Sequence, residues 1–102
     1  MKLIEQEMLY AIKNYKKWKK NNTKVIINET IIDIFLYDNL ICRFDFVNKT
    51  VYLDDKNYRT LTTKSRLNAL CSYFKLPTIY QKKRIWYIGK DKWLGTYYTT
   101  LN

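Results

Sequence analysis

The stretch from residue 23 to residue 53 constrains the fold most, because β-branched and aromatic residues dominate it. Such residues favour extended backbone, and polar pairs interrupt them at intervals that suit hairpin turns. The two turn candidates are Asp38-Asn39 and Asn48-Lys49, since Asn and Asp tolerate positive φ. The stretch predicts a meander of three or four antiparallel strands, over residues 25–27, 31–35, 40–47 and 51–53.

Helical patterns precede and follow this meander. Residues 3–20 carry apolar side chains at helical spacing, and Asn21-Asn22 marks the expected end of that helix. A second helix begins near Thr62 or Thr63, either of which can cap it, and ends before Pro77. Its expected apolar stripe is Leu67, Leu70, Cys71 and Phe74.

The C-terminal part predicts one or two strands over residues 78–88. Tyr97–Leu101 is a candidate edge strand, although the sequence leaves open whether 93–101 is extended. Helices and runs of strands occupy separate parts of the chain, and this order predicts an α+β fold. The expected fold has an N-terminal helix, an antiparallel meander, a second helix and a C-terminal β-hairpin, with both helices on one face of the sheet. The length of 102 residues suits a single domain, residues 1–102.

Charge indicates the class of partner. The chain has 19 Lys and Arg against 9 Asp and Glu, a net charge of +10. An excess this large on so small a protein favours nucleic acid or another acidic surface as the partner.

The first basic feature is a run of lysines in and after the first predicted helix. They are either a solvated helix face or a surface that contacts phosphates and releases counterions. The candidate residues are Lys13, Lys16, Lys17, Lys19 and Lys20.

The second basic feature lies at the start of the second predicted helix. A helix N-terminus attracts anions, whereas cations there oppose the helix dipole, so a bound anion would relieve the mismatch. Ordinary capping with solvated cations is the alternative. The candidate residues are Arg59, Thr62, Thr63, Lys64, Ser65 and Arg66.

The third basic feature, Lys82, Lys83 and Arg84, lies between Tyr80 and Trp86-Tyr87. Aromatic side chains beside cations provide stacking surfaces next to phosphate contacts. In the alternative, Trp86 packs in the core and the cations protect a sheet edge from pairing.

Enzymatic chemistry has little support. The chain has no His and only two Gly, so no His-based site or Gly-rich phosphate loop is expected. Cys42 and Cys71 are predicted to be reduced and buried, and Asp54-Asp55 to end a strand. We therefore expect no catalytic residue, metal or cofactor. No apolar run approaches the ~18 residues that span a bilayer, so a membrane is not an expected partner.

Four segments resemble a family of small phage proteins, the most specific being Tyr58–Leu70 with its Arg-Leu-Asn helix start. Tyr37-Asp38 stands where that family commonly has a His-Gly pair. The other segments are Asn22–Val25, Leu36–Ile41 and Gln81–Tyr87. The resemblance implies a phage or mobile-element origin and action in the cytoplasm of a bacterial host.

Two functions follow as hypotheses. Small proteins of such origin include anti-CRISPR inhibitors, which implies a CRISPR nuclease or its guide RNA as the partner. The alternative is a nucleic-acid-binding accessory protein or regulator. Residues 3–75 also resemble the double-stranded-RNA-binding domain in topology, without its Lys-Lys-x-Ala-Lys motif.

Overall fold

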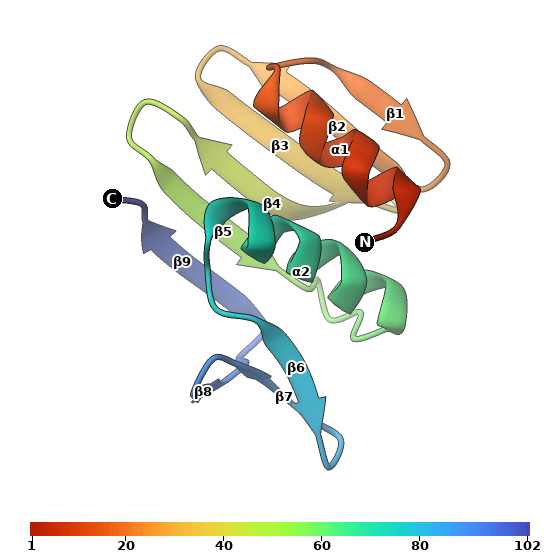
Figure 1. The fold of residues 1–102 in the computed structure, drawn as a ribbon, viewed down its shortest axis with the longest axis vertical. Coiled ribbons are helices and arrows are strands. Elements are labelled where there is room, and N and C mark those ends of the chain that lie inside the picture. The colour runs from red at the N-terminus through yellow and green to blue at the C-terminus, as the bar shows by residue number, and fades with distance from the viewer.

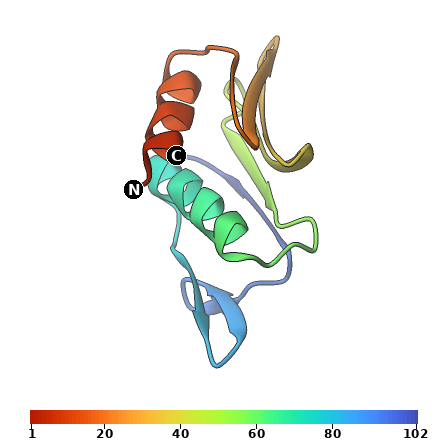
Figure 2. The same ribbon diagram turned by 90° about the vertical axis from the view of Figure 1, so that its right-hand side faces the viewer.

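The computed structural model describes residues 1–102 and has a six-stranded antiparallel sheet as its main layer. Both helices lie on one face of this sheet (Figure 1; Figure 2). The order of the strands across the sheet is β1-β2-β3-β4-β5-β9. These elements are α1 (Leu3–Lys13), β1 (Trp18–Lys20), β2 (Thr23–Asn28), β3 (Ile31–Leu36), β4 (Asn39–Asp45), β5 (Thr50–Asp54), α2 (Leu61–Phe74) and β9 (Thr96–Thr100).

A second, three-stranded sheet projects from one end of the molecule (Figure 1; Figure 2). It consists of β6 (Ile79–Lys82), β7 (Ile85–Ile88) and β8 (Asp91–Lys92), and we call residues 79–92 the basic arm. Its inner side chains Ile79, Trp86 and Ile88 belong to the same buried cluster as the helices and the main sheet. The arm therefore shares its hydrophobic core with the rest of the chain.

The predicted α+β layout of helix, meander, helix and hairpin is wrong. The structure is mostly β, with two helices, a six-stranded sheet and a separate three-stranded sheet. Strand β9 returns from the C-terminal segment to pair with β5, and five strands separate α1 from α2. The five strands between the two helices also differ from the double-stranded-RNA-binding domain, which has three.

The first helix ends earlier than predicted. Asn14 follows α1 and donates its side-chain amide to the Tyr10 carbonyl, and Tyr15 then adopts a left-handed φ of 53°. A left-handed residue is a common way to end a helix. Trp18 lies on β1, from which it packs against the core, so its helical spacing from Tyr15 was misleading.

The second helix begins at Leu61, close to the predicted start near Thr62 or Thr63, but neither of these residues caps it. Thr60 is its N-cap, and the Thr60 hydroxyl accepts a hydrogen bond from the Thr63 amide at 3.1 Å. The predicted apolar stripe is confirmed, because all of its members are buried: Leu67, Leu70, Cys71 and Phe74. The left-handed Lys75 ends the helix before Pro77.

The hairpin between β3 and β4 turns one residue earlier than predicted. Tyr37 and Asp38 have φ values of 50° and 63°, whereas Asn39 already pairs with Leu36. Two consecutive positive φ values define a type I′ turn, whose twist matches that of the strands it joins. The bulky Tyr37 therefore holds a backbone conformation that Asn or Gly adopts more easily.

Candidate functional site

The outer face of the basic arm combines stacked aromatic rings with lysines. Across the three strands Tyr80 pairs with Tyr87, which pairs with Lys92. The two rings are stacked, with centroids 5.3 Å apart and planes 19° apart, and Tyr80 is 40% exposed. Lys82 lies two residues along β6 from Tyr80, so its side chain projects from the same face.

The tip of the arm places two cations in a strained turn. Lys83 and Arg84 have φ values of 51° and 68° in a position that usually selects Asn and Gly. A positive φ is common at the turns of this chain, where eleven non-Gly residues adopt it. The turn leaves both cations exposed at the tip of the arm.

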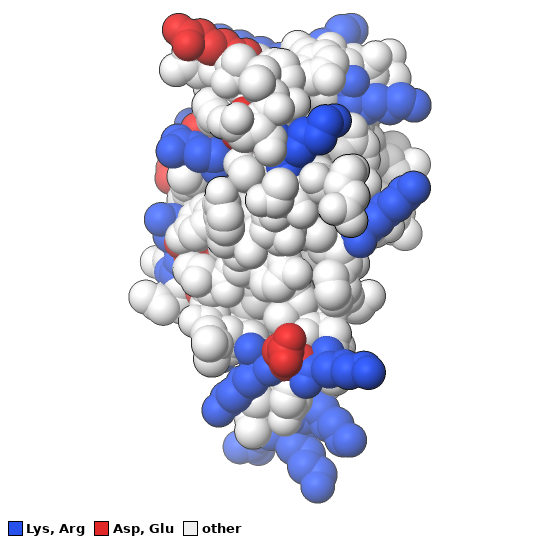
Figure 3. Space-filling model, turned by 90° about the vertical axis from the view of Figure 1, so that its left-hand side faces the viewer, with Lys and Arg blue, Asp and Glu red and all other residues white.

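Positive charge on the arm is not neutralised within the chain. The arm carries five cations, with Asp91 as its one acid: Lys82, Lys83, Arg84, Lys90 and Lys92. None of them takes part in the ion pairs of the structure. Figure 3 shows Lys and Arg side chains gathered around one acidic side chain at the lower end of the molecule.

Trp86 connects the arm to the start of α2. The Arg59 guanidinium lies 5.9 Å from the centre of the Trp86 ring, and the Lys64 ammonium lies 5.8 Å from it. Cations at this distance are attracted to the face of an aromatic ring. The structure thus brings Arg59 and Lys64, from the second basic feature, beside the arm that carries the third.

Asp55 anchors the arm to the main sheet. Its buried carboxylate accepts hydrogen bonds from the Trp93 indole at 2.7 Å, the Arg59 Nε at 3.0 Å and the backbone N–H of Asn57 at 2.8 Å. The Asp55 amide donates to the Gly95 carbonyl at 3.0 Å. These contacts give Asp55 a structural role at the end of β5, as expected for a residue that ends a strand.

Arg66 is not on the accessible surface. It is 4% exposed and forms an ion pair with buried Glu5, in which Nη1 and Oε2 lie 2.8 Å apart. Ser65 donates to the same carboxylate oxygen, and Thr63 is buried beside the Thr60 cap. Three of the predicted binding residues therefore serve the fold, while the half-buried Thr62 lies on the first turn of α2.

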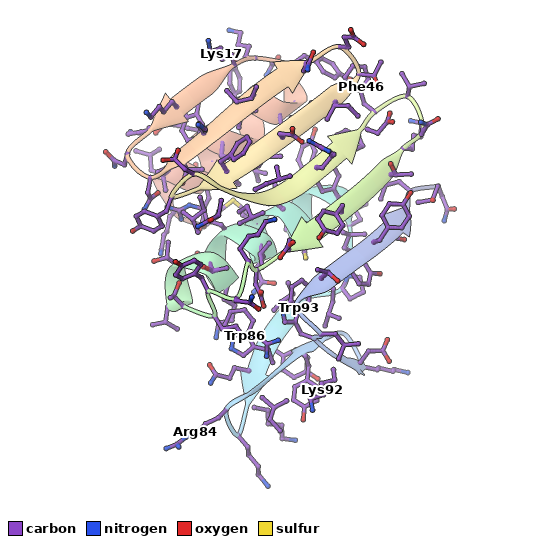
Figure 4. The ribbon with its side chains drawn as sticks, turned by 180° about the vertical axis from the view of Figure 1, so that it is seen from behind. Lys17, Phe46, Arg84, Trp86, Lys92 and Trp93 are labelled. Atoms are coloured by element: carbon purple, nitrogen blue, oxygen red, sulfur yellow. The ribbon has the colours of Figure 1, made fainter.

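The lysines of the first basic feature lie at the other end of the molecule. Figure 4 shows Lys17 at one end of the long axis and Arg84 and Lys92 at the other. Lys20 is paired with Glu7 at 2.9 Å, and Lys16 lies 5.9 Å from the centre of the Tyr10 ring. The remaining members, Lys13, Lys17 and Lys19, are exposed and form no ion pair.

Lys90, Lys92 and the contact between Tyr80 and Tyr87 were not predicted from the sequence. A signal for that contact was present. A two-residue turn at Lys83-Arg84 pairs the residues on either side of it, and alternation then places Tyr80 opposite Tyr87. Lys92 could not be placed in this way, because a two-residue strand leaves no pattern.

The arrangement suits binding. Stacked aromatic rings beside unpaired cations match the two parts of a single-stranded nucleic acid, its bases and its phosphates. No group of three or more potential metal-ligating side chains lies close together. Neither helix has the length and apolar character needed to cross a membrane.

The fold and this surface define a small, mostly β protein with a basic, aromatic arm. The family described as Kyanoviridae Gp96 protein matches residues 1–101, so the chain belongs to this phage protein family. The match confirms the phage origin implied by the resemblance in sequence. No curated protein and no solved structure matches the chain.

Proposed function

We propose that the protein binds single-stranded nucleic acid through the basic arm. The observation that carries the proposal is the row of Tyr80, Tyr87 and Lys92, with Lys82 on the same face. Bases stack on exposed aromatic rings whatever their sequence, and nearby cations follow the phosphates. A single strand is favoured over a duplex, because paired bases are stacked on each other and do not reach side chains in this way.

The test compares two variants that lose the same charge. The arm variant is Lys82→Gln/Lys83→Asn/Arg84→Gly, which removes three cations and gives the turn the Asn-Gly pair that its positive φ values favour. Any loss of binding therefore cannot come from a weakened hairpin. The matched control, Lys16→Gln/Lys17→Gln/Lys19→Gln, removes three cations from the opposite end.

Binding is measured by fluorescence anisotropy with a labelled single-stranded oligonucleotide across a salt series. For single strands the logarithmic salt slope is about −0.7 per neutralised phosphate, so the arm variant loses affinity and its slope is shallower by about 2. The control keeps the wild-type affinity and slope. If the control loses affinity and the arm variant does not, the lysines near α1 form the interface and the proposal is wrong.

Binding to a host nuclease, such as a CRISPR effector, is the competing outcome. A protein interface depends less on salt than a polyanion interface does. If wild-type protein binds no free oligonucleotide yet binds a nuclease with little salt dependence, the nucleic-acid proposal is refuted.

A further inference from the structure

We infer that a cavity beside the basic arm receives one base of the bound strand. The inference rests on the proposed function and assigns a base-binding pocket to it. The cavity has a volume of about 300 Å³ and lies between the β3–β4 turn and the start of α2. That volume is at the lower end of small-molecule pockets, which suits a single planar ring system.

Two tyrosines from different elements line this cavity. Tyr37 comes from the β3–β4 turn and Tyr58 from the segment before α2, and they are 65% and 59% exposed. Exposed aromatic rings beside a cavity offer faces on which a base can stack.

The remaining walls combine apolar and hydrogen-bonding groups. Leu36 and Ile41 line the cavity, and its polar lining residues are Asn39, Asp55, Thr60 and Thr63. The Asp55 carboxylate is already engaged by Arg59 and Trp93. The Asn39 amide can both donate to and accept from the edge of a base. An apolar cavity with a few polar groups is typical of sites that bind a flat heterocycle.

The cavity is linked to the arm through one contact of Arg59. Tyr58 and Thr60 line the cavity, while Arg59, between them, lies 5.9 Å from the Trp86 ring of β7. Arg59 also pairs with Asp55, which lines the cavity, so the cavity adjoins the inner face of the arm, opposite to Tyr80 and Tyr87. In the inferred mode the strand therefore passes from the outer face over the edge of the arm to Arg59, and its next base enters the cavity.

The test removes the aromatic rings and leaves the charge unchanged. The pocket variant is Tyr37→Leu/Tyr58→Leu, with Tyr58→Leu alone as a second variant that leaves the strained turn intact. The matched control is Tyr98→Leu, a 65% exposed tyrosine on β9 that does not line the cavity. Melting temperatures establish that each variant is folded.

The probes are a 12-nucleotide oligothymidylate and an abasic 12-mer with the same phosphates and no bases. One stacked base is worth about a five- to 150-fold change in affinity. We expect the affinity of the pocket variant for the oligothymidylate to fall by that factor. Its affinity for the abasic strand and its salt slope should stay unchanged. The Tyr98→Leu control binds both probes as the wild type does.

Two results would overturn the inference and can be told apart. If the pocket variants bind the oligothymidylate as tightly as wild type while the arm variant binds weakly, the cavity holds no base and the arm proposal stands. If the wild-type protein binds neither probe, the arm proposal fails together with the pocket.

Discussion

Replacing Arg66 by Met is expected to destabilise the protein strongly, although Arg66 is a cation at the start of a helix. The Arg66 side chain joins three elements. Its Nη1 donates to Glu5 at 2.8 Å, its Nε to the Thr23 hydroxyl at 3.0 Å and its Nη2 to the Asn22 side chain at 3.3 Å. Because Glu5 is itself buried, Arg66→Met leaves a carboxylate without its countercharge in the interior.

Breaking one partner of a buried ion pair costs about 3–5 kcal/mol, because the remaining charge stays desolvated. Domains of this size are stable by only about 5–15 kcal/mol, so the variant loses a large part of its free energy of unfolding. Glu5→Gln/Arg66→Met removes the unpaired charge as well, and we expect it to recover about 2 kcal/mol relative to Arg66→Met.

Urea unfolding followed by far-ultraviolet circular dichroism measures these effects. With an m-value of about 1.5 kcal/mol per molar urea, the Arg66→Met midpoint falls by about 2–3 M. Lys64→Met is the control, since Lys64 is on the same helical turn without an ion pair and should change stability by about 0.5 kcal/mol or less. If Arg66→Met does not fold, Arg66→Lys, which keeps the charge, gives a measurable partial loss. A loss below about 1 kcal/mol for Arg66→Met, or no recovery in the double variant, would refute the reasoning.

Three further predictions concern the core, the thiols and the anchor of the arm. Leu70→Ala should cost about 2–5 kcal/mol in urea unfolding, because Leu70 is fully buried; a loss under about 1 kcal/mol would contradict its place in the core. Burial raises the pKa of Cys71 to about 12, and it raises the pKa of Cys42 as well. Both thiols should resist alkylation at pH 8 until the protein is denatured, and rapid labelling of the folded protein would refute this. In the unfolded chain the pKa of the thiol is about 8.5, so the stabilising effect of the buried, protonated Cys71 is complete below that pH. It falls as the pH rises toward 12, and Cys71→Ala should lessen this fall. Asp55→Ala removes the acceptor of three hydrogen bonds, so we expect faster amide hydrogen exchange in β6–β8 than in β2–β4; uniform exchange would show that the arm is held by other contacts.

Local patterns in the sequence were sufficient for much of the fold. The apolar stripe of α2 and the alternation along β2, β3 and β5 are set by which side of each element is buried, and this repeats within a few residues. The turns were also visible in outline, although the β3–β4 turn lies one residue earlier than expected. The connection between β4 and β5 has four residues, Phe46–Lys49, instead of the predicted two-residue turn at Asn48-Lys49. The position of the β3–β4 turn depends on a register shift between Ile34 and Phe35, which no local pattern reveals.

Pairings between distant segments account for the errors. Strand β9 pairs with β5 across the whole second half of the chain, and Glu5 meets Arg66 from 61 residues away. The dipole of α2, taken alone, disfavours a cation such as Arg66 near the start of the helix. A buried carboxylate supplied by α1 outweighs the dipole, because that countercharge lies 2.8 Å away in the interior.

The same pairing explains where the excess charge of the protein appears. Most of the acidic side chains are engaged in ion pairs within the body: Glu5, Glu7, Asp33, Asp38, Asp54 and Asp55. Each pair neutralises a cation of the main sheet, the helices or their connections, whereas the arm has Asp91 as its one acid. The net charge of +10 is therefore concentrated where cations have no ion-pair partner, mainly at the arm and at the lysines near α1, with Lys49, Lys64 and Lys75 elsewhere. Of these two ends, the arm alone sets its cations around a stacked tyrosine pair, and for this reason the matched charge variants of the two ends are the decisive comparison.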